Sequence, residues 1–189
     1  MDDMDTLKQQ LAEAAEIADI SSRRIFVLAV ITRAAAAFGV QPILVGGCAV
    51  EFYTMGGYAT RDVDVIMPAL PKVERMMSDL GFVKKGRYWT HAGLELLIES
   101  PAAELAGDLN RVIATRTEAG PAYVIGLEDL IIDRLNAYVH WESPEDGRWA
   151  TRLAAEHTGR VDWDYLEVRA VEEKVEQALA EIRQTIERV

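Results

Sequence analysis

Two aspartates separated by one residue are the first feature of this 189-residue sequence that could do chemistry. Asp62 and Asp64 flank Val63 in a segment that alternates carboxylates with apolar residues. Side chains two positions apart in a β-strand point to the same face, so the pair would place two carboxylates side by side. Their repulsion is costly in a folded protein unless a cation relieves it. Magnesium suits such a site, because it commonly takes one or two carboxylates and fills its shell with water and substrate phosphates.

A glycine pair upstream predicts a site for phosphate groups. Gly46-Gly47 follow the apolar run 43–45 and precede a short helical segment at 48–53. A strand that enters a helix through two glycines exposes backbone N–H groups, and the missing side chains allow a triphosphate to approach closely. We expect neighbouring strands to bring this turn beside the aspartates. Two metal ions about 3.5–4 Å apart can clamp the oxygens of a phosphoryl or nucleotidyl transfer.

A third carboxylate is expected from another strand, predicted for residues 94–98. Glu95 is a lone charge at the start of this apolar segment, whereas Glu99 shares its face but lies at the strand end, before Ser100-Pro101. We therefore predict Glu95 as a third metal ligand, or as the base that takes the proton from an acceptor hydroxyl. Each feature alone has an ordinary explanation as a turn, a solvated strand edge or a surface glutamate. Their combination and order predict a site.

The runs ILVGGCAV at 43–50 and TRDVDV at 60–65 resemble the signature of the polymerase-β-like nucleotidyltransferase superfamily. They are most similar to its small prokaryotic branch, which includes minimal nucleotidyltransferases and the toxins of abortive-infection type IV systems. The resemblance implies transfer of a nucleoside monophosphate from a nucleoside triphosphate to a hydroxyl, with Mg²⁺ or Mn²⁺. Its motifs lie within residues 40–100.

Carried onto this sequence, the resemblance assigns nucleotide contacts to Gly46, Gly47, Thr60 and Arg134. It assigns metal binding and catalysis to Asp62, Asp64 and Glu95. Arg134 lies in the segment 126–135, which resembles the helix after the catalytic sheet in the same branch. Pairing of Arg134 with Asp133 or Glu128 on a solvated face is an equally good interpretation.

Two departures from the family pattern leave the activity open. Tyr58 stands where many relatives carry an arginine, and the third acid is a glutamate where aspartate is commoner. The first hypothesis is a magnesium-dependent nucleotidyltransferase acting on an RNA end or a protein hydroxyl, as a component of a toxin–antitoxin pair. The alternative is a catalytically weak or inactive nucleotide-binding regulatory or antitoxin partner with the same fold. Its partner would be the cognate toxin or antitoxin, or a second copy in a homodimer.

The remaining pattern predicts an α+β fold, with a nucleotidyltransferase-like mixed sheet of about five or six strands flanked by helices. Helical spacing covers residues 5–38 with one break, and a further helix is predicted between Pro71 and Gly81. Strands are predicted at 43–45, 62–67, 82–90, 94–98, 111–117 and 123–125. We expect a core of residues 1–126 with N-terminal helices, and a C-terminal helical region of residues 127–189 packed on it.

Composition narrows the class of protein. The net charge is −11, and no basic run is longer than Lys84-Lys85-x-Arg87, so broad binding to nucleic-acid phosphates is disfavoured. Contact with one RNA end or with a basic protein stays open. Cys48 is the one cysteine, which excludes a disulfide framework. The acidic segment Met1–Asp5 and the lack of a membrane-length apolar stretch predict a soluble, cytoplasmic protein.

Overall fold

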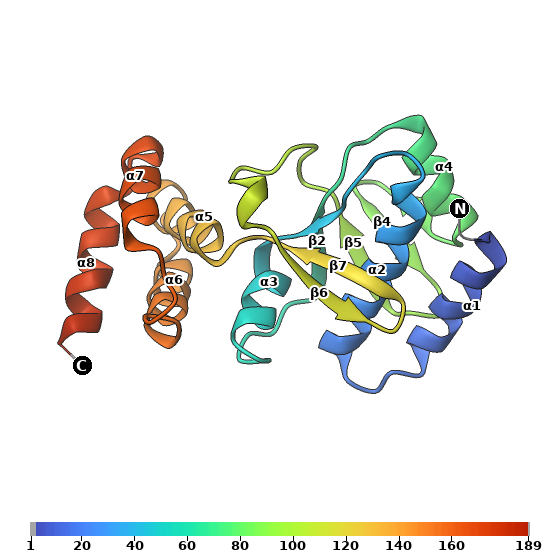
Figure 1. The fold of residues 1–189 in the computed structure, drawn as a ribbon, viewed down its shortest axis with the longest axis horizontal. Helices are drawn as coiled ribbons and strands as arrows, with labels where there is room; N and C mark the ends of the chain where they lie inside the picture. The colour runs from blue at the N-terminus through green and yellow to red at the C-terminus, as the bar shows by residue number, and fades with distance from the viewer. Residues whose placement is uncertain (1–2, 189) are drawn as a thin grey trace.

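A mixed β-sheet forms the centre of the computed structural model, which describes residues 3–188 (Figure 1). Within that range the sheet has seven strands: β1 Ile43–Leu44, β2 Asp62–Ile66, β3 Val83–Lys85, β4 Tyr88–His91, β5 Leu96–Glu99, β6 Ile113–Thr117 and β7 Gly120–Val124. Their spatial order is β3-β4-β5-β2-β1-β7-β6. Strand β2 is antiparallel to β1 and parallel to β5, so the two aspartates lie on a central strand.

Helices cover the sheet and continue beyond it. The N-terminal part contains α1 Met4–Ala15, α2 Ile20–Ala36, α3 Gly46–Tyr53 and α4 Pro71–Asp79, with a short 3₁₀ helix, η1, at Leu109–Arg111. The C-terminal part contains α5 Leu127–His140, α6 Pro144–Glu156, α7 Trp163–Glu173 and α8 Glu176–Glu187. Figure 1 shows α5–α8 gathered at one end of the molecule, with α3 between them and the sheet. The α+β prediction is confirmed, and the predicted division at residue 126 coincides with the start of α5.

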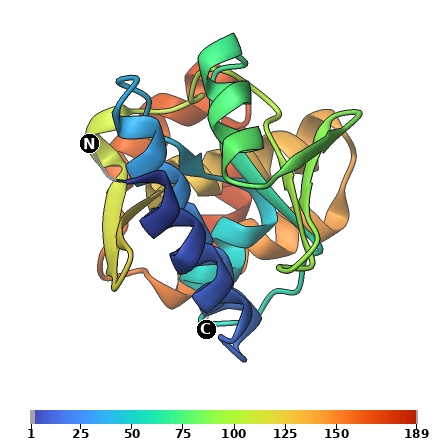
Figure 2. The same ribbon diagram turned by 90° about the vertical axis from the view of Figure 1, so that its right-hand side faces the viewer.

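Helix α2 ties the N-terminal helices to the centre of the molecule. Its residues Phe26–Thr32 are all buried, and they pack in the core with the inner strands. Figure 2, seen along the long axis, shows α1 and α2 in front of the sheet, with the β6–β7 hairpin and the β3–β4 hairpin at opposite edges. The predicted break between the two helices is confirmed, because Asp19 caps the start of α2 by accepting from the Ser22 backbone N–H at 2.7 Å.

One predicted strand is wrong in a way that matters for the site. Residues 82–90 form the two strands β3 and β4, separated by a tight turn at Gly86 and Arg87 in which Gly86 has φ +62°. Glycine adopts this left-handed conformation at little cost, so the chain can reverse there. This extra hairpin accounts for the seventh strand in the described part of the chain.

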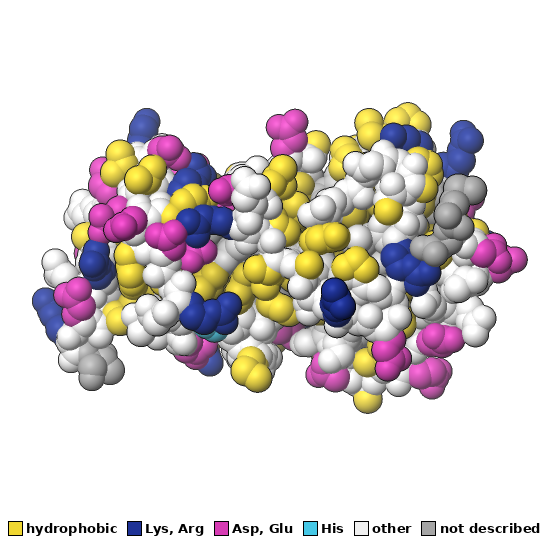
Figure 3. Space-filling view, in the orientation of Figure 1, with side chains coloured by type: hydrophobic (Ala, Val, Ile, Leu, Met, Phe, Trp, Pro, Cys, Tyr) yellow, Lys and Arg dark blue, Asp and Glu magenta, His cyan; other side chains and the backbone are white. Residues whose placement is uncertain are grey.

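Some predictions fall on the ends of the chain. Met1 and Asp2 of the acidic N-terminal segment, and Val189 at the end of the predicted C-terminal helical region, lie outside the described residues. Within residues 3–188, none of the helices combines the length and the apolar character needed to cross a bilayer. On the face drawn in Figure 3, acidic and basic side chains are interspersed and do not form a continuous basic surface.

Candidate active site

The register of two parallel strands decides which carboxylates meet. Asp62 lies opposite Leu97 and Asp64 lies opposite Glu99 in the β2–β5 ladder. Residues opposite each other in a ladder share a face of the sheet, so Glu99 joins the pair on β2. We call Asp62, Asp64 and Glu99 the carboxylate cluster. All three side chains are partly buried.

The prediction that Glu95 supplies the third carboxylate needs correction on geometric grounds. Strand β5 begins at Leu96, and Glu95 is exposed in the preceding turn with φ +53°. The two-residue period that would place Glu95 on the face of Glu99 holds only inside a strand, and Glu95 lies before it. Glu99, set aside because it ends the strand, is the residue brought beside Asp64.

The glycine pair lies directly against Asp64. The Val45 backbone N–H donates to the Asp64 carbonyl at 2.9 Å, which joins the end of β1 to β2. Helix α3 starts at Gly46, whose φ is +60°, and a Cβ at this position would overlap the Asp64 carboxylate. Only a residue without a side chain allows this approach. The N-terminus of a helix and a carboxylate therefore face one space, as the sequence predicts.

Thr60 also lies at this turn. A Cβ on Gly47 would come within 3.1 Å of the Thr60 side chain and within 2.8 Å of the Tyr58 ring. The Thr60 carbonyl accepts from Arg24 at 2.6 Å, and Arg24 also pairs with Glu51 on α3 at 2.5 Å. A buried arginine on α2 therefore holds the entry to β2 and the helix after the glycines in one arrangement. In the sequence, Arg24 is a basic residue inside an apolar helical stripe, and this pattern did not lead to its prediction as part of the site.

Electrostatics distinguish Asp64 from an ordinary surface aspartate. Burial, together with the charges of Glu99 and Asp62, raises the pKa of its carboxyl to about 6. Arg134 acts against this rise. A carboxyl held among like charges and partly removed from water is the environment that a bound cation stabilises.

The residues present fit a magnesium ion that shares its shell with a substrate. Among residues 3–188, no group of three or more histidine, cysteine or acidic side chains is placed so that it could hold a metal ion by itself. Magnesium is commonly held by one or two carboxylates, with water and phosphate oxygens as the other ligands. The hard oxygen donors of the cluster, next to a helix N-terminus suited to phosphates, match that incomplete protein shell.

Arg134 connects the C-terminal helices to the site. It lies on α5 with only 14% of its side chain exposed, and it pairs with Asp133 at 2.5 Å and Asp146 at 2.7 Å. The interpretation that Arg134 pairs with Asp133 holds, but its surroundings are not a solvated face. Its charge opposes the raised pKa of Asp64, so the guanidinium acts electrostatically on the cluster.

An aromatic pair adjoins the glycine turn. The Tyr58 ring, at the position of the family's arginine, contacts Trp149 of α6 edge to face, with centroids 4.9 Å apart. Both side chains are half-buried. Burial raises the pKa of the Tyr58 hydroxyl, which Arg134 opposes and Asp146 reinforces. This contact places Trp149 where α6 meets the core.

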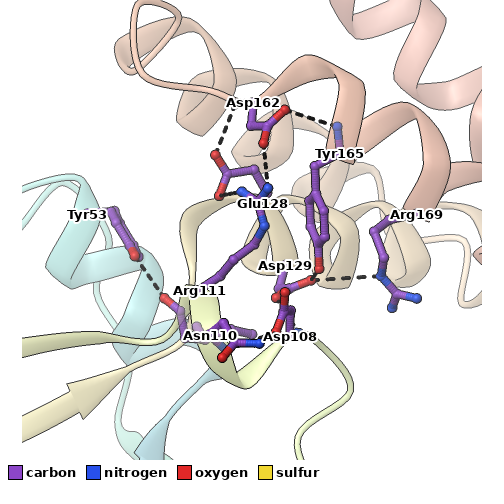
Figure 4. A network of polar contacts seen from close by, with 10 residues as sticks. Tyr53, Asp108, Asn110, Arg111, Glu128, Asp129, Asp162, Tyr165 and Arg169 are labelled. Carbon is purple, nitrogen blue, oxygen red and sulfur yellow. Dashed lines mark hydrogen bonds and ion pairs between the residues drawn. The ribbon is translucent and has the colours of Figure 1, made fainter.

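A second group of charges joins the core to the C-terminal helices. This junction network, shown in Figure 4, comprises Asp108, Arg111, Glu128, Asp129, Asp162, Tyr165 and Arg169. The guanidinium of Arg111 lies between Glu128 and Asp162 and stacks on the Tyr165 ring at 3.7 Å. Asp129, which is 1% exposed, accepts from the Asp108 backbone N–H at 2.9 Å and from the Tyr165 hydroxyl at 2.7 Å.

With the sheet order and the site described, the fold can be compared with known proteins. Neither a protein-family model nor a curated protein sequence matches the chain. The chain nevertheless has the α+β fold of a nucleotidyltransferase.

Two similar solved structures are of the antibiotic-resistance factor ANT(2'')-Ia. Its solution structure is 15% identical in sequence, with a TM-score of 0.50 over 82% of this chain and 93% of that one. Its crystal structure in complex with adenylyl-2''-tobramycin is 18% identical, with a TM-score of 0.48 over 82% and 94%. At these identities the likeness concerns the fold.

Proposed function

We propose that this protein is a magnesium-dependent nucleotidyltransferase of the polymerase-β-like type, which transfers a nucleoside monophosphate from a nucleoside triphosphate to a hydroxyl. The observation that carries the proposal is the position of Asp64. It lies between the carboxylates of Asp62 and Glu99 and directly against Gly46 at the start of α3. The proposed metal ligands and the backbone N–H groups that would donate hydrogen bonds to phosphate therefore face the same space.

Each residue has a role that follows from its place. The backbone N–H groups of Gly46 and Gly47 bind the triphosphate, and Thr60 borders that turn. One or two carboxylates of the cluster would hold Mg²⁺ or Mn²⁺ together with phosphate oxygens, and the ion would supply charge neutralisation at the transferring phosphoryl group. Glu99 takes the place first predicted for Glu95, as a ligand or as the base.

The proposed reaction balances without a further reagent. The acceptor oxygen forms a bond to the α-phosphorus, and the bond from that phosphorus to the pyrophosphate oxygen breaks. The acceptor proton passes to an ionised carboxylate of the cluster, which acts as the base. Pyrophosphate leaves with the displaced electron pair.

The surroundings of the site favour an acceptor that is not a long polyanion. Besides the cluster, Asp133 and Asp146 lie around Arg134 and compensate its charge. The chain as a whole carries a net charge of −11. A protein hydroxyl, a single RNA end or a small hydroxylated molecule is compatible with this negative electrostatic potential, whereas an extended RNA backbone is repelled by it.

Label transfer from α-³²P-labelled nucleoside triphosphates tests the proposal. The purified protein would be incubated with each of the four triphosphates, Mg²⁺, and either RNA oligonucleotides, a cell extract or tobramycin. We expect labelled product with at least one acceptor, and a loss on the order of a thousandfold in Asp64→Asn, since metal-ion stabilisation contributes several kcal/mol. Asp79→Asn removes an exposed carboxylate of α4 and serves as the matched control. Equal transfer by both variants would contradict the assignment.

A second candidate function is nucleotide binding without turnover. It is favoured by Tyr58, whose ring lies against Gly47 where the resemblance places phosphate, and by Arg134, which is already paired with two aspartates. Calorimetric titration with ATP and Mg²⁺ separates the two functions. Tight binding without label transfer in any acceptor mixture would establish the regulatory protein. Under either function we also propose pairing with a cognate toxin or antitoxin, or a homodimer, and a cytoplasmic location. Co-purification with the products of neighbouring genes tests the pairing.

A further inference from the structure

Arg87 lies at the outer edge of the carboxylate cluster. It follows Gly86 in the turn between β3 and β4, and 68% of its side chain is exposed. The β4–β5 register places Tyr88 opposite Glu99, which brings the preceding residue within reach of that carboxylate. The Arg87 Nε lies 3.3 Å from Glu99 Oε1. Glu99 of the cluster therefore has a cation in contact.

The side chain of Arg87 is tethered independently of Glu99. Its Nη2 donates to the Tyr88 hydroxyl at 2.6 Å, and its guanidinium lies over the Tyr88 ring, 4.9 Å from the centroid. The hydrogen bond to Tyr88 and the charges of Glu99 and Asp62 raise the pKa of Arg87. The arginine therefore stays charged and close to the cluster even when its contact with Glu99 is broken.

The two partners in this ion pair differ in exposure. Glu99 has only 14% of its side chain exposed, so it depends on a neighbouring cation, whereas Arg87 is well solvated without it. An exposed arginine loses little when it leaves a single carboxylate, because water solvates the guanidinium. A divalent cation that also contacts Asp62 or Asp64 interacts more strongly with Glu99 than Arg87 does. The ion pair between Arg87 and Glu99 can therefore be replaced by a contact between Glu99 and a divalent cation.

We propose that Arg87 is the resident counter-cation of Glu99 and that a divalent metal ion must displace it to use that carboxylate. The inference rests on the proposed function, because it takes the carboxylate cluster as the metal site. Arg87 lowers the affinity of the nucleotide-free site for metal. Glu99 is thereby paired with a cation until a metal–nucleotide complex arrives, while Asp62 and Asp64, among residues 3–188, stay without one on that strand face.

Manganese binding to the nucleotide-free full-length protein tests this role without any turnover. The electron paramagnetic resonance signal of free Mn²⁺ would be followed during titration of the wild type, Arg87→Gln and Lys85→Gln. Lys85 is a matched control, since it is an exposed cation two residues away on β3 and is not the partner of Glu99. We expect Arg87→Gln to tighten Mn²⁺ binding about two- to fivefold, and Lys85→Gln to change it less.

Two further variants make the outcomes distinct. In a Glu99→Gln background, Arg87→Gln should no longer tighten binding, because the displaced contact is gone. If Arg87→Gln and Lys85→Gln have equal effects, if Arg87→Gln weakens binding, or if its effect persists without Glu99, the inference is overturned. Asp64→Asn reports on the site itself. Unchanged Mn²⁺ affinity in that variant would overturn the metal site behind the proposed function, whereas lost affinity together with an inert Arg87→Gln would overturn the role of Arg87 alone.

Discussion

The carboxylate cluster and the junction network both withdraw acidic side chains from water, but they treat the charges differently. In the junction network each buried carboxylate has donors that match it. Glu128 accepts from the Asp162 backbone N–H at 3.0 Å and pairs with Arg111, and Asp129 accepts from Asp108 and Tyr165. In the cluster, Asp64 has two carboxylates as neighbours, and its pKa is raised to about 6.

This difference separates a structural use of charge from a functional one. Charges that are matched by hydrogen-bond donors hold two parts of the chain together, because removing either partner leaves a buried polar group unpaired. Like charges that remain crowded reduce stability in the apo protein and become favourable only when a ligand neutralises them. The same residue types therefore stabilise the contact of α5 and α7 with the core in the junction network, and form a candidate cation site in the carboxylate cluster.

The largest stability effect is expected at the junction network. Asp129→Ala removes the acceptor for the Asp108 backbone N–H and the Tyr165 hydroxyl, and it should lower the free energy of unfolding by about 3 kcal/mol. Urea denaturation of the metal-free protein measures this loss. Asp164→Asn, an exposed acid of α7, is the control and should be nearly neutral. By contrast, Asp64→Asn should not destabilise the apo protein, and an equal loss in both regions would remove the distinction between them.

A smaller effect should separate the two arginines. Arg111→Gln removes the contacts with Glu128 and Asp162 and the stacking on Tyr165, and it should cost about 1–2 kcal/mol. Arg87→Gln should leave the urea midpoint unchanged, since its side chain is exposed and pairs with one carboxylate. Both variants lose one positive charge, so net charge is controlled. A destabilised Arg87→Gln protein would mean that the cluster is also held together by matched charges.

A third expected effect is a dependence of stability on pH that belongs to Asp64. Because its folded pKa of about 6 lies above the ordinary 3.8, the folded protein binds more protons than the unfolded chain between these values. Stability therefore falls as the pH rises from about 4 to about 6, and the full loss is present above that window. Thermal unfolding of the metal-free wild type should show this fall relative to Asp64→Asn. Saturating Mg²⁺ should reverse it, and parallel profiles with and without the substitution would contradict the raised pKa.

The local parts of the site could be predicted from sequence because they depend on short-range geometry. The two-residue period of a strand is enough to place Asp62 and Asp64 on one face. The order of an apolar strand, two glycines and a short helix is enough to predict that Gly46 begins α3. The helical breaks and the start of the C-terminal helices follow from capping and periodicity in the same way.

Only the tertiary structure decided which distant residues join these parts. The choice between Glu95 and Glu99 depends on where β5 begins and on its register with β2, and a strand boundary moved by two residues changes the answer. Likewise, the tight turn at Gly86 divides the one predicted strand into β3 and β4. This turn places Arg87 in contact with Glu99. Asp146, one partner of Arg134, and both partners of Arg111 lie on other elements, where helix packing and not sequence spacing sets the distance. The sequence by itself determined the chemistry of the aspartate and glycine motifs, whereas register and packing determined which other charges surround them.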